Sequence, residues 1–327
     1  MGHYSGVKMD RLSSGLERDE MEKSAQEVSA ITLNSNEEQL IERSSRRLAM
    51  PDELFQLNEL DVLYDEESSA LWTYMRPLVR PSFTPPMLAD FERWQALIAP
   101  NFGPGKVQLK YLVLGSRAPG VFCFGGDLEL FQQFIRSGNR DGLVRYGYRC
   151  VEILNRNIHT LDLPMITIGL VQGQALGGGF EALLSFDVIV AERGSSFGLP
   201  EVMFGLFPGM GAHAILSRKL GTAMAERLIL SNESYSAEQM YDMGIVNVLA
   251  EPGEGVAAVR NYMAKAERKH AGLVGTRRAM RAASPIELDE FYRIVEIWAD
   301  TALRLNEQDL KLMHRLASAQ SRLVKAA

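Results

Sequence analysis

The chain has 327 residues, of which 46% are hydrophobic and 23% are charged, the ordinary balance of a globular protein with a sizeable core. Its formal net charge of −6 gives no basic field, so we expect no nucleic-acid partner. Its two cysteines, Cys123 and Cys150, lie outside any metal-binding pattern, and no apolar run is long enough for a membrane span; we expect a cytoplasmic protein without a metal site or membrane contact.

The chain divides by composition into three parts. Residues 1–50 are polar, charged and poor in aromatic residues, which predicts a flexible N-terminal arm. Residues 51–255 alternate apolar strands, glycine turns and helices, which predicts an α/β core with mostly parallel strands. Residues 256–327 carry helical periodicity and no strand signal, which predicts a C-terminal helical subdomain covering the core or a neighbouring subunit.

Within the core, several elements are expected in chain order from periodicity and turn signals. They are two strands within 60–75, a helix at 88–98, a strand at 110–114, helices at 128–137 and 143–160, and strands at 165–171 and 188–191. Asp127 precedes one of these helices and is expected to cap it rather than to react.

Two glycine-rich stretches lie where an expected strand leads toward an expected helix. Residues 124–127 read FGGD, and residues 173–181 read GQALGGGFE. Glycine lets the backbone approach a ligand, and a helix N-terminus offers free N–H groups, so these stretches could stabilise an oxyanion. Most such glycines only permit tight packing, however. A dinucleotide fingerprint is absent, and Gly105-Lys106 continues with Val107, which excludes a phosphate P-loop.

Two glutamates complete the chemically informative pattern. Glu181 follows the triple glycine, and Glu201 lies in FGLPEV, both among apolar neighbours. Apolar surroundings raise the pKa of a carboxyl group, which suits proton transfer near neutral pH. Two such groups can divide the work of base and acid. Either glutamate alone is better explained as a helix cap or an arginine partner, so the hypothesis depends on the pair.

Residues 171–212 read VQGQALGGGFEALLSFDVIVAERGSSFGLPEVMFGLFPGMGA. They contain G-x-A-x-G-G-G-x-E, D-x-x-x-A, F-G-x-P-E and P-G-x-G in this order. This pattern resembles the crotonase (enoyl-CoA hydratase/isomerase) superfamily, and the similar region covers roughly residues 55–300. The resemblance implies an α/β fold with a crotonase (ClpP/crotonase-like) spiral β/α core and a C-terminal helical oligomerisation subdomain. It also implies a homotrimer or a dimer of trimers.

Further segments are similar to one branch, the diffusible signal factor synthases of bacterial quorum sensing. These segments are FGGDLELFQQFIRSG, SAEQMYDMGIVNVL and IWADTALRLNEQDLKLMHRL. The resemblance implies an enzyme that dehydrates a 3-hydroxyacyl chain on acyl carrier protein and hydrolyses the thioester to release a cis-2-unsaturated fatty acid. No cofactor is implied, and a cognate signal-sensor protein is a further implied partner.

Two alternatives stay open at this point. One is an enoyl-CoA hydratase or isomerase of fatty acid metabolism, which would share the fold and the glutamates but use a different carrier. The other is a catalytically silent regulatory partner built on the same fold.

The resemblance assigns roles to five residues. Glu181 and Glu201 match the two family glutamates, and our hypothesis takes Glu201 as the base and Glu181 as the acid. The amide of Gly178 matches one oxyanion donor. The other donor is expected at Gly125, or at Phe124 if the alignment shifts by one residue. Phe124 stands where hydratases usually carry a small residue, a departure that argues against ordinary CoA handling and is compatible with the synthase branch.

An acyl tail also needs an apolar tunnel. We expect its walls among apolar residues near the motifs, each of which is equally a candidate core residue. These residues are Phe131, Leu176, Met203, Leu206 and Trp298.

Overall fold

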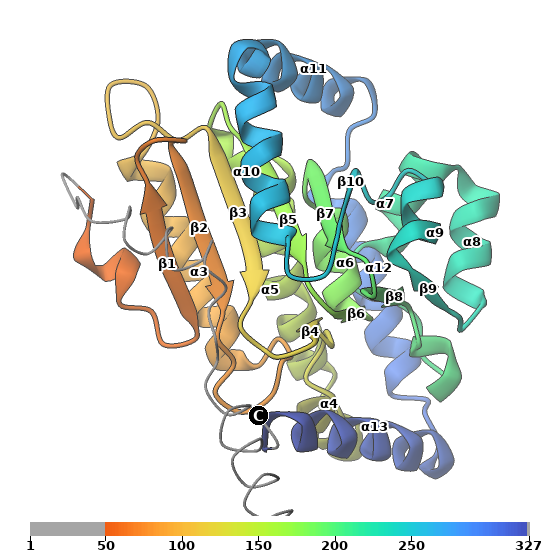
Figure 1. Cartoon of the computed structure of the whole chain (residues 1–327). Coiled ribbons are helices and arrows are strands. Elements are labelled where there is room, and N and C mark those ends of the chain that lie inside the picture. Colours follow the sequence, from red (N-terminus) through yellow and green to blue (C-terminus); the bar gives the residue numbers. More distant parts are fainter. Residues whose placement is uncertain (1–49, 326–327) are drawn as a thin grey trace, which may run out of the picture.

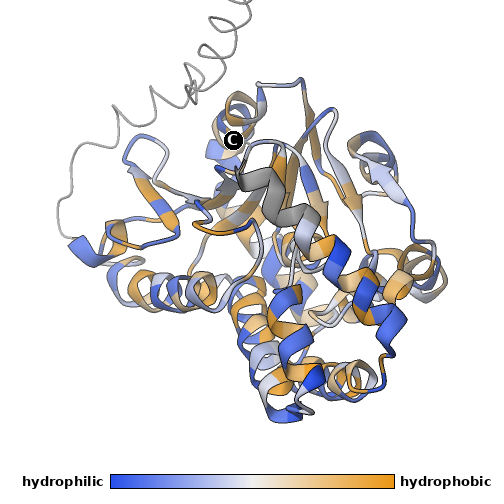
Figure 2. Ribbon diagram, turned by 90° about the horizontal axis from the view of Figure 1, so that it is seen from below, coloured by the Kyte–Doolittle hydropathy of each residue, from blue (hydrophilic) through white to orange (hydrophobic). Residues whose placement is uncertain are grey.

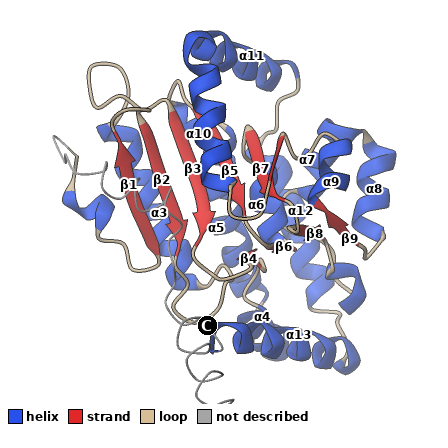
Figure 3. Ribbon diagram, viewed as in Figure 1, coloured by secondary structure: helices blue, strands red, loops and turns tan. Residues whose placement is uncertain are grey.

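The computed structural model describes residues 50–325 (Figure 1), so the arm predicted for residues 1–50 lies outside the described residues except for its last one. The described chain forms two sheets surrounded by helices (Figure 3). The larger sheet has six strands in the order β1-β2-β3-β5-β7-β10, and the smaller has four in the order β4-β6-β8-β9. The predicted α/β class is therefore confirmed.

The larger sheet is parallel except at one edge, where β1 runs antiparallel to β2. Its strands are β1 (Leu60–Asp65), β2 (Ala70–Met75), β3 (Tyr111–Ser116), β5 (Ile166–Val171), β7 (Val188–Glu192) and β10 (Val248–Ala250). The central strands are almost continuously apolar because helices cover both faces of the sheet.

The smaller sheet gives the fold its spiral course, because the chain visits it after successive strands of the larger sheet. Its strands are β4 (Val121–Cys123), β6 (Gln174–Leu176), β8 (Ser196–Gly198) and β9 (Ser234–Ser236). β4, β6 and β8 each follow a strand of the larger sheet and pair in parallel, while β9 pairs antiparallel with β8. The chain thus passes from the large sheet to the small one three times, which makes successive turns of a β/α spiral.

One face of the large sheet carries the helices that build the site. They are α3 (Pro85–Asn101), α4 (Leu128–Arg136), α5 (Arg140–Ile158) and α6 (Gly178–Leu184). Thr84 caps α3 by accepting a hydrogen bond from Met87 N at 3.3 Å. Asp127 caps α4 by accepting from Leu130 N at 3.0 Å, which confirms the predicted cap.

The opposite face is covered by α10 (Gly255–Ala266), which Figure 1 shows in front of the sheet between β3 and β5; α11 (His270–Ala283) follows it at the top of the view. Val256, Val259 and Met263 of α10 pack in one buried cluster with Trp72 and Tyr111 of the sheet. Viewed from below, the helices have apolar stripes and hydrophilic outer surfaces (Figure 2).

The remaining elements surround the smaller sheet and the site. They are α7 (Ala212–Leu220), α8 (Thr222–Leu230), α9 (Ala237–Asp242), α12 (Leu288–Ala302), α13 (Glu307–Lys325) and the short helices η1 (Asp52–Phe55), η2 (Thr160–Asp162), η3 (Glu201–Phe204) and η4 (Glu267–Lys269). α12 packs along α5, and α13 lies against α4 and η3. The C-terminal helical region is therefore present. Among the described residues, no helix combines the length and hydropathy that a bilayer crossing requires.

Candidate active site

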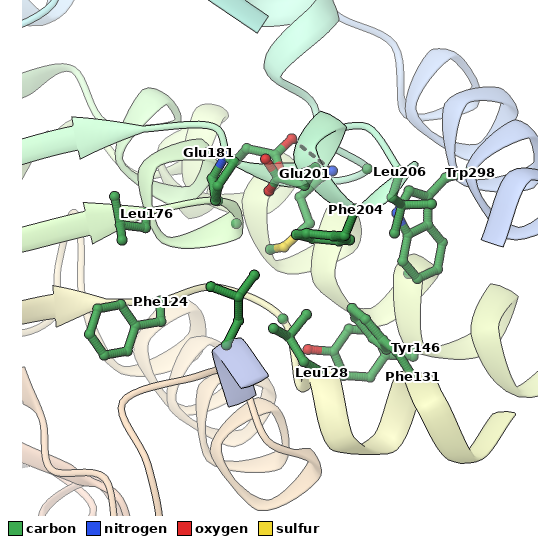
Figure 4. A pocket seen from close by; sticks show the side chains of 18 residues that line it. Phe124, Leu128, Phe131, Tyr146, Leu176, Glu181, Glu201, Phe204, Leu206 and Trp298 are labelled. Atoms are coloured by element: carbon green, nitrogen blue, oxygen red, sulfur yellow. Dashed lines mark hydrogen bonds between the residues drawn. The ribbon is translucent and has the colours of Figure 1, made fainter. Parts of the chain in front are cut away.

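A pocket of about 140 Å³ lies at the N-terminal end of α6 and is bordered by α4, α5, η3 and α12. Glu181, Glu201 and Gly178 line it, so the structure brings the glutamate of the F-G-x-P-E motif to the residues of the glycine-rich stretch. Figure 4 shows the two glutamates beside each other, with Phe131 and Trp298 further along the pocket. The rest of the lining is predominantly apolar.

Glu181 lies in the first turn of α6 and is 1% exposed. Its Oε1 accepts hydrogen bonds from Met210 N at 2.8 Å and Ala212 N at 3.0 Å. These amides reach it because α7 begins at Ala212, after Gly211 turns the chain with φ 117°. Burial raises the pKa of Glu181 to about 7, against the opposing effect of the Ala212, Met210 and Gly211 amides.

Glu201 opens η3 directly after Pro200. The residue is partly exposed, but its Oε2 is buried and has no hydrogen-bond partner in the part of the chain that the structure describes. Burial raises the pKa of Glu201 well above its ordinary value, and the charge of Glu181 raises it further. The directions and causes of the two shifts favour the charge on Glu181, whose Oε1 accepts from two amides, and the proton on Glu201, whose buried Oε2 accepts from no group among the described residues.

This distribution predicts the pH dependence of turnover. If the active form holds one proton between the two glutamates, kcat/KM should rise with pH through about 7, where Glu181 loses its proton. The rising limb belongs to the pair, because the two groups titrate together. A pH–rate profile measures it, and a rate that is constant or falls through neutrality would contradict the assignment.

The glycines beside the pair form a close crossing of two backbones. Gly178 is the first residue of α6, so its N–H has no acceptor within the helix, and it lines the pocket. A Cβ on Gly125 would lie only 2.4 Å from Gly178 N. The positive φ of Gly125, 87°, allows this approach.

The structure changes the prediction for the second oxyanion donor. The Gly125 amide donates to Cys123 Sγ at 3.3 Å, and the Phe124 amide donates to Pro81 O at 2.7 Å. Both amides therefore already have an acceptor, that of Phe124 in the segment before α3 and that of Gly125 at the end of β4. Gly126, the next residue, lines the pocket beside Gly178 and is the glycine of this loop that the geometry favours.

Four of the five predicted tunnel residues line the pocket: Phe131, Leu176, Leu206 and Trp298. Phe131 and Trp298 meet edge to face with ring centroids 5.0 Å apart. Met203 does not line the pocket and is 53% exposed. Successive side chains of the short helix η3 point in different directions, so its neighbour Phe204 is the residue that faces inward.

Two residues that sequence reasoning missed shape the site. Met210 donates its amide to Glu181 and lines the pocket with its side chain. Its position inside the P-G-x-G motif could have suggested this role. Tyr146 of α5 donates its hydroxyl to Phe83 O at 2.6 Å and accepts from Asp127 N at 3.1 Å, which fixes the loop before α4. No sequence signal marks it, since buried helix tyrosines are common.

Within residues 50–325, no three His, Cys, Asp or Glu side chains come close enough together to hold a metal ion. The groups that line the pocket include two carboxyl groups, glycine backbone and apolar side chains.

A spiral of α/β turns with an acid/base pair at a helix N-terminus defines the crotonase class of proteins. The chain belongs to the enoyl-CoA hydratase/isomerase family, which it matches over residues 104–284, more than half of its length.

Curated relatives are similar over part of the chain. The mitochondrial enoyl-CoA hydratase domain-containing protein 2 of Mus musculus is 33% identical over 161 residues, which cover 49% of this chain and 52% of that protein. The short-chain-enoyl-CoA hydratase of Clostridium acetobutylicum is 39% identical over 99 residues, which cover 30% of this chain and 37% of that protein. The matched stretch thus spans about half, or less, of these relatives.

Solved structures share the fold. Pseudomonas aeruginosa DspI superposes with a TM-score of 0.61 at 23% identity, covering 71% of this chain and 90% of that one. An enoyl-CoA hydratase from Mycobacterium avium subsp. paratuberculosis gives a TM-score of 0.64 at 20% identity, covering 81% of this chain and 98% of that one. At these identities, the similarity concerns the fold alone.

Proposed function

We propose that this protein is a diffusible signal factor synthase. It would dehydrate a 3-hydroxyacyl chain carried on acyl carrier protein and hydrolyse the thioester to release a cis-2-unsaturated fatty acid. The observation that carries the proposal is that Glu181 and Glu201 line one apolar pocket, in which burial raises the pKa of both carboxyl groups. The sequence resemblance to the synthase branch, including the bulky Phe124 at the pocket, supports the finer assignment.

The dehydration step follows from the proton distribution. The thioester oxygen accepts hydrogen bonds from the Gly178 and Gly126 amides, which acidifies the C2 proton. The Glu181 carboxylate takes this proton, and the protonated Glu201 gives its proton to the C3 hydroxyl, which leaves as water. These roles reverse our sequence-based hypothesis, because Glu201 could act as base only after its proton had moved to Glu181.

The hydrolysis step restores the starting state. After dehydration Glu201 is ionised and Glu181 is protonated. Glu201 can then take a proton from a water molecule that attacks the thioester carbon, while the two amides stabilise the tetrahedral oxyanion. Glu181 protonates the departing sulfur, so each glutamate returns to its first form. The cycle needs no metal or redox cofactor.

A plain enoyl-CoA hydratase is the second candidate, favoured by the family match and by the names of the curated relatives. Hydration is the reverse of this dehydration, so Glu201 would take a proton from the attacking water and Glu181 would protonate C2, starting from the proton distribution that dehydration leaves behind. The two functions therefore differ in the carrier and in whether the thioester is cleaved.

Mass spectrometry of the products separates the candidates. The purified protein is mixed with 3-hydroxydecanoyl and 3-hydroxydodecanoyl thioesters of acyl carrier protein and, in parallel, of CoA. We expect free cis-2-enoic acid from the carrier-protein substrates. A carrier-bound enoyl product without free acid would instead support the hydratase, and no reaction with either carrier would support a silent regulatory partner.

The same proposal includes the substrate carrier, the cellular compartment and the oligomeric state. Acyl carrier protein is the substrate-bearing partner, the cytoplasm is the compartment, and the C-terminal helices α12 and α13 join copies into a trimer or a dimer of trimers. Contact with a cognate signal sensor is a separate role that the family resemblance suggests.

A further inference from the structure

A second cavity, of about 30 Å³, lies between α3, α5 and α6 and does not include either glutamate. Most of its walls are large apolar side chains: Leu88, Phe91, Trp94, Ile153, Leu154 and Phe186. Gln95 and Asn157 also contribute to it; their amide nitrogens are held in place, while Gln95 Oε1 and Asn157 Oδ1 are buried without a hydrogen-bond partner among the described residues. Gln95 Nε2 donates to Ile153 O at 2.9 Å, and Asn157 Nδ2 donates to Ser185 Oγ at 2.8 Å.

The second cavity adjoins the active-site pocket along two helices. On α5, Tyr146 and Gly147 line the pocket, and Cys150 and Leu154, one and two turns further, line the second cavity. This spacing keeps all four residues on one helix face. On α6, Glu181 lines the pocket and the next residue, Ala182, lines the second cavity, as does Ser185 just after the helix.

Met210 lines both spaces and is the side chain that separates them. Its backbone is fixed, because its amide donates to Glu181. Its thioether lies against Gly178, where an added Cβ would come within 2.5 Å of Sδ. An unbranched methionine side chain can change rotamer without moving the backbone, so this partition can open while the Glu181 hydrogen bond persists.

We propose that Met210 is a gate and that the second cavity receives the distal end of a long acyl chain. The proposal rests on the acyl-thioester function and adds to it a physical limit on chain length. Short chains end in the active-site pocket. Longer chains turn Met210 aside and bury their last methylenes among the apolar side chains of α3 and α5, which removes hydrocarbon from water.

The test is equilibrium binding, measured by calorimetry, of S-butyl, S-octyl and S-dodecyl pantetheine, which cannot react. Leu154→Phe fills the second cavity from α5, and Leu114→Phe fills it from β3. Leu143→Phe is the matched control, because Leu143 is a buried leucine of α5 that lines neither space. Thermal unfolding identifies which variants are folded.

For the wild type and the control, affinity should rise by about fourfold per methylene across the series. Both filling variants should bind the butyl compound with the affinity of the wild type. Their affinity should not increase, however, from the octyl to the dodecyl compound. If a folded filling variant gains affinity from the octyl to the dodecyl compound as steeply as the wild type does, the proposal is overturned. A wild type that binds the dodecyl compound, yet releases no acid from the 3-hydroxyacyl substrates, would remove the proposed function and leave the second cavity as a chain-binding site.

Discussion

Glu181→Gln and Glu201→Gln should each lower kcat/KM for product formation by about 10²–10⁴-fold, the range expected when a general acid or base is removed. Glutamine keeps the shape of glutamate but can neither take nor give the required proton. The two losses should not add in the double variant, because each residue is useless without the other. Steady-state kinetics with a 3-hydroxyacyl thioester measures all three variants.

Stability distinguishes this loss from unfolding. The folded-state pKa of Glu181 lies above its ordinary value of 4.5, so its contribution to stability is present at low pH and lost as pH rises through about 7. Replacing either buried glutamate should therefore not lower Tm at neutral pH.

Glu192→Gln is the matched control for these variants. Glu192 is 8% exposed, and its Oε1 accepts from Gln172 Nε2 and Gly255 N, both at 2.9 Å. This variant should lose stability but keep its activity per folded molecule. Full activity in Glu181→Gln or Glu201→Gln would contradict the acid/base assignment.

Gly125→Ala is expected to have the second large effect, a loss of about 10²–10³-fold in kcat, the value of one oxyanion donor. The new methyl group would lie 2.4 Å from Gly178 N, a backbone atom that can yield only if α6 shifts. Such a shift moves the Gly178 amide away from the thioester oxygen. KM should change less than kcat, because the interaction is made mainly in the transition state.

Gly120→Ala provides the control for backbone strain. Gly120 also has a positive φ, 65°, but a Cβ there would meet no atom within 4 Å. Both alanine variants should lose stability from the left-handed backbone, by about 1–3 kcal/mol. Only Gly125→Ala should lose turnover, and equal kcat in the two variants would show that the glycine crossing does not support catalysis.

The sequence predicted the elements whose pattern is local. β3, β5 and β7 appear as apolar runs because they are buried on both faces, and α4 and α5 are marked by helical periodicity. The strands of the smaller sheet could not be predicted. Each has three residues, too few for alternation to show, and their pairing depends on the spiral bringing distant segments together.

The site was predictable in its members but not in its electrostatics. The motifs identified Glu181 and Glu201 as a pair. Which one carries the charge depends on the Met210 and Ala212 amides, which reach Glu181 from the start of α7, 29 and 31 residues further along the chain. The choice of glycine in the donor loop also depends on contacts that the sequence does not show, because the Phe124 amide donates to Pro81 O and the Gly125 amide to Cys123 Sγ.

The central claim is that Glu201 holds the proton of the pair while Glu181 is ionised. Infrared difference spectroscopy of protein labelled with carboxyl-¹³C glutamate tests it directly, because a buried protonated carboxyl group has a carbonyl band separate from that of a carboxylate. At a pH just above neutrality, we predict one such band in the wild type, absent from Glu201→Gln and retained in Glu181→Gln. A wild type without the band, or a band lost only in Glu181→Gln, would contradict the account.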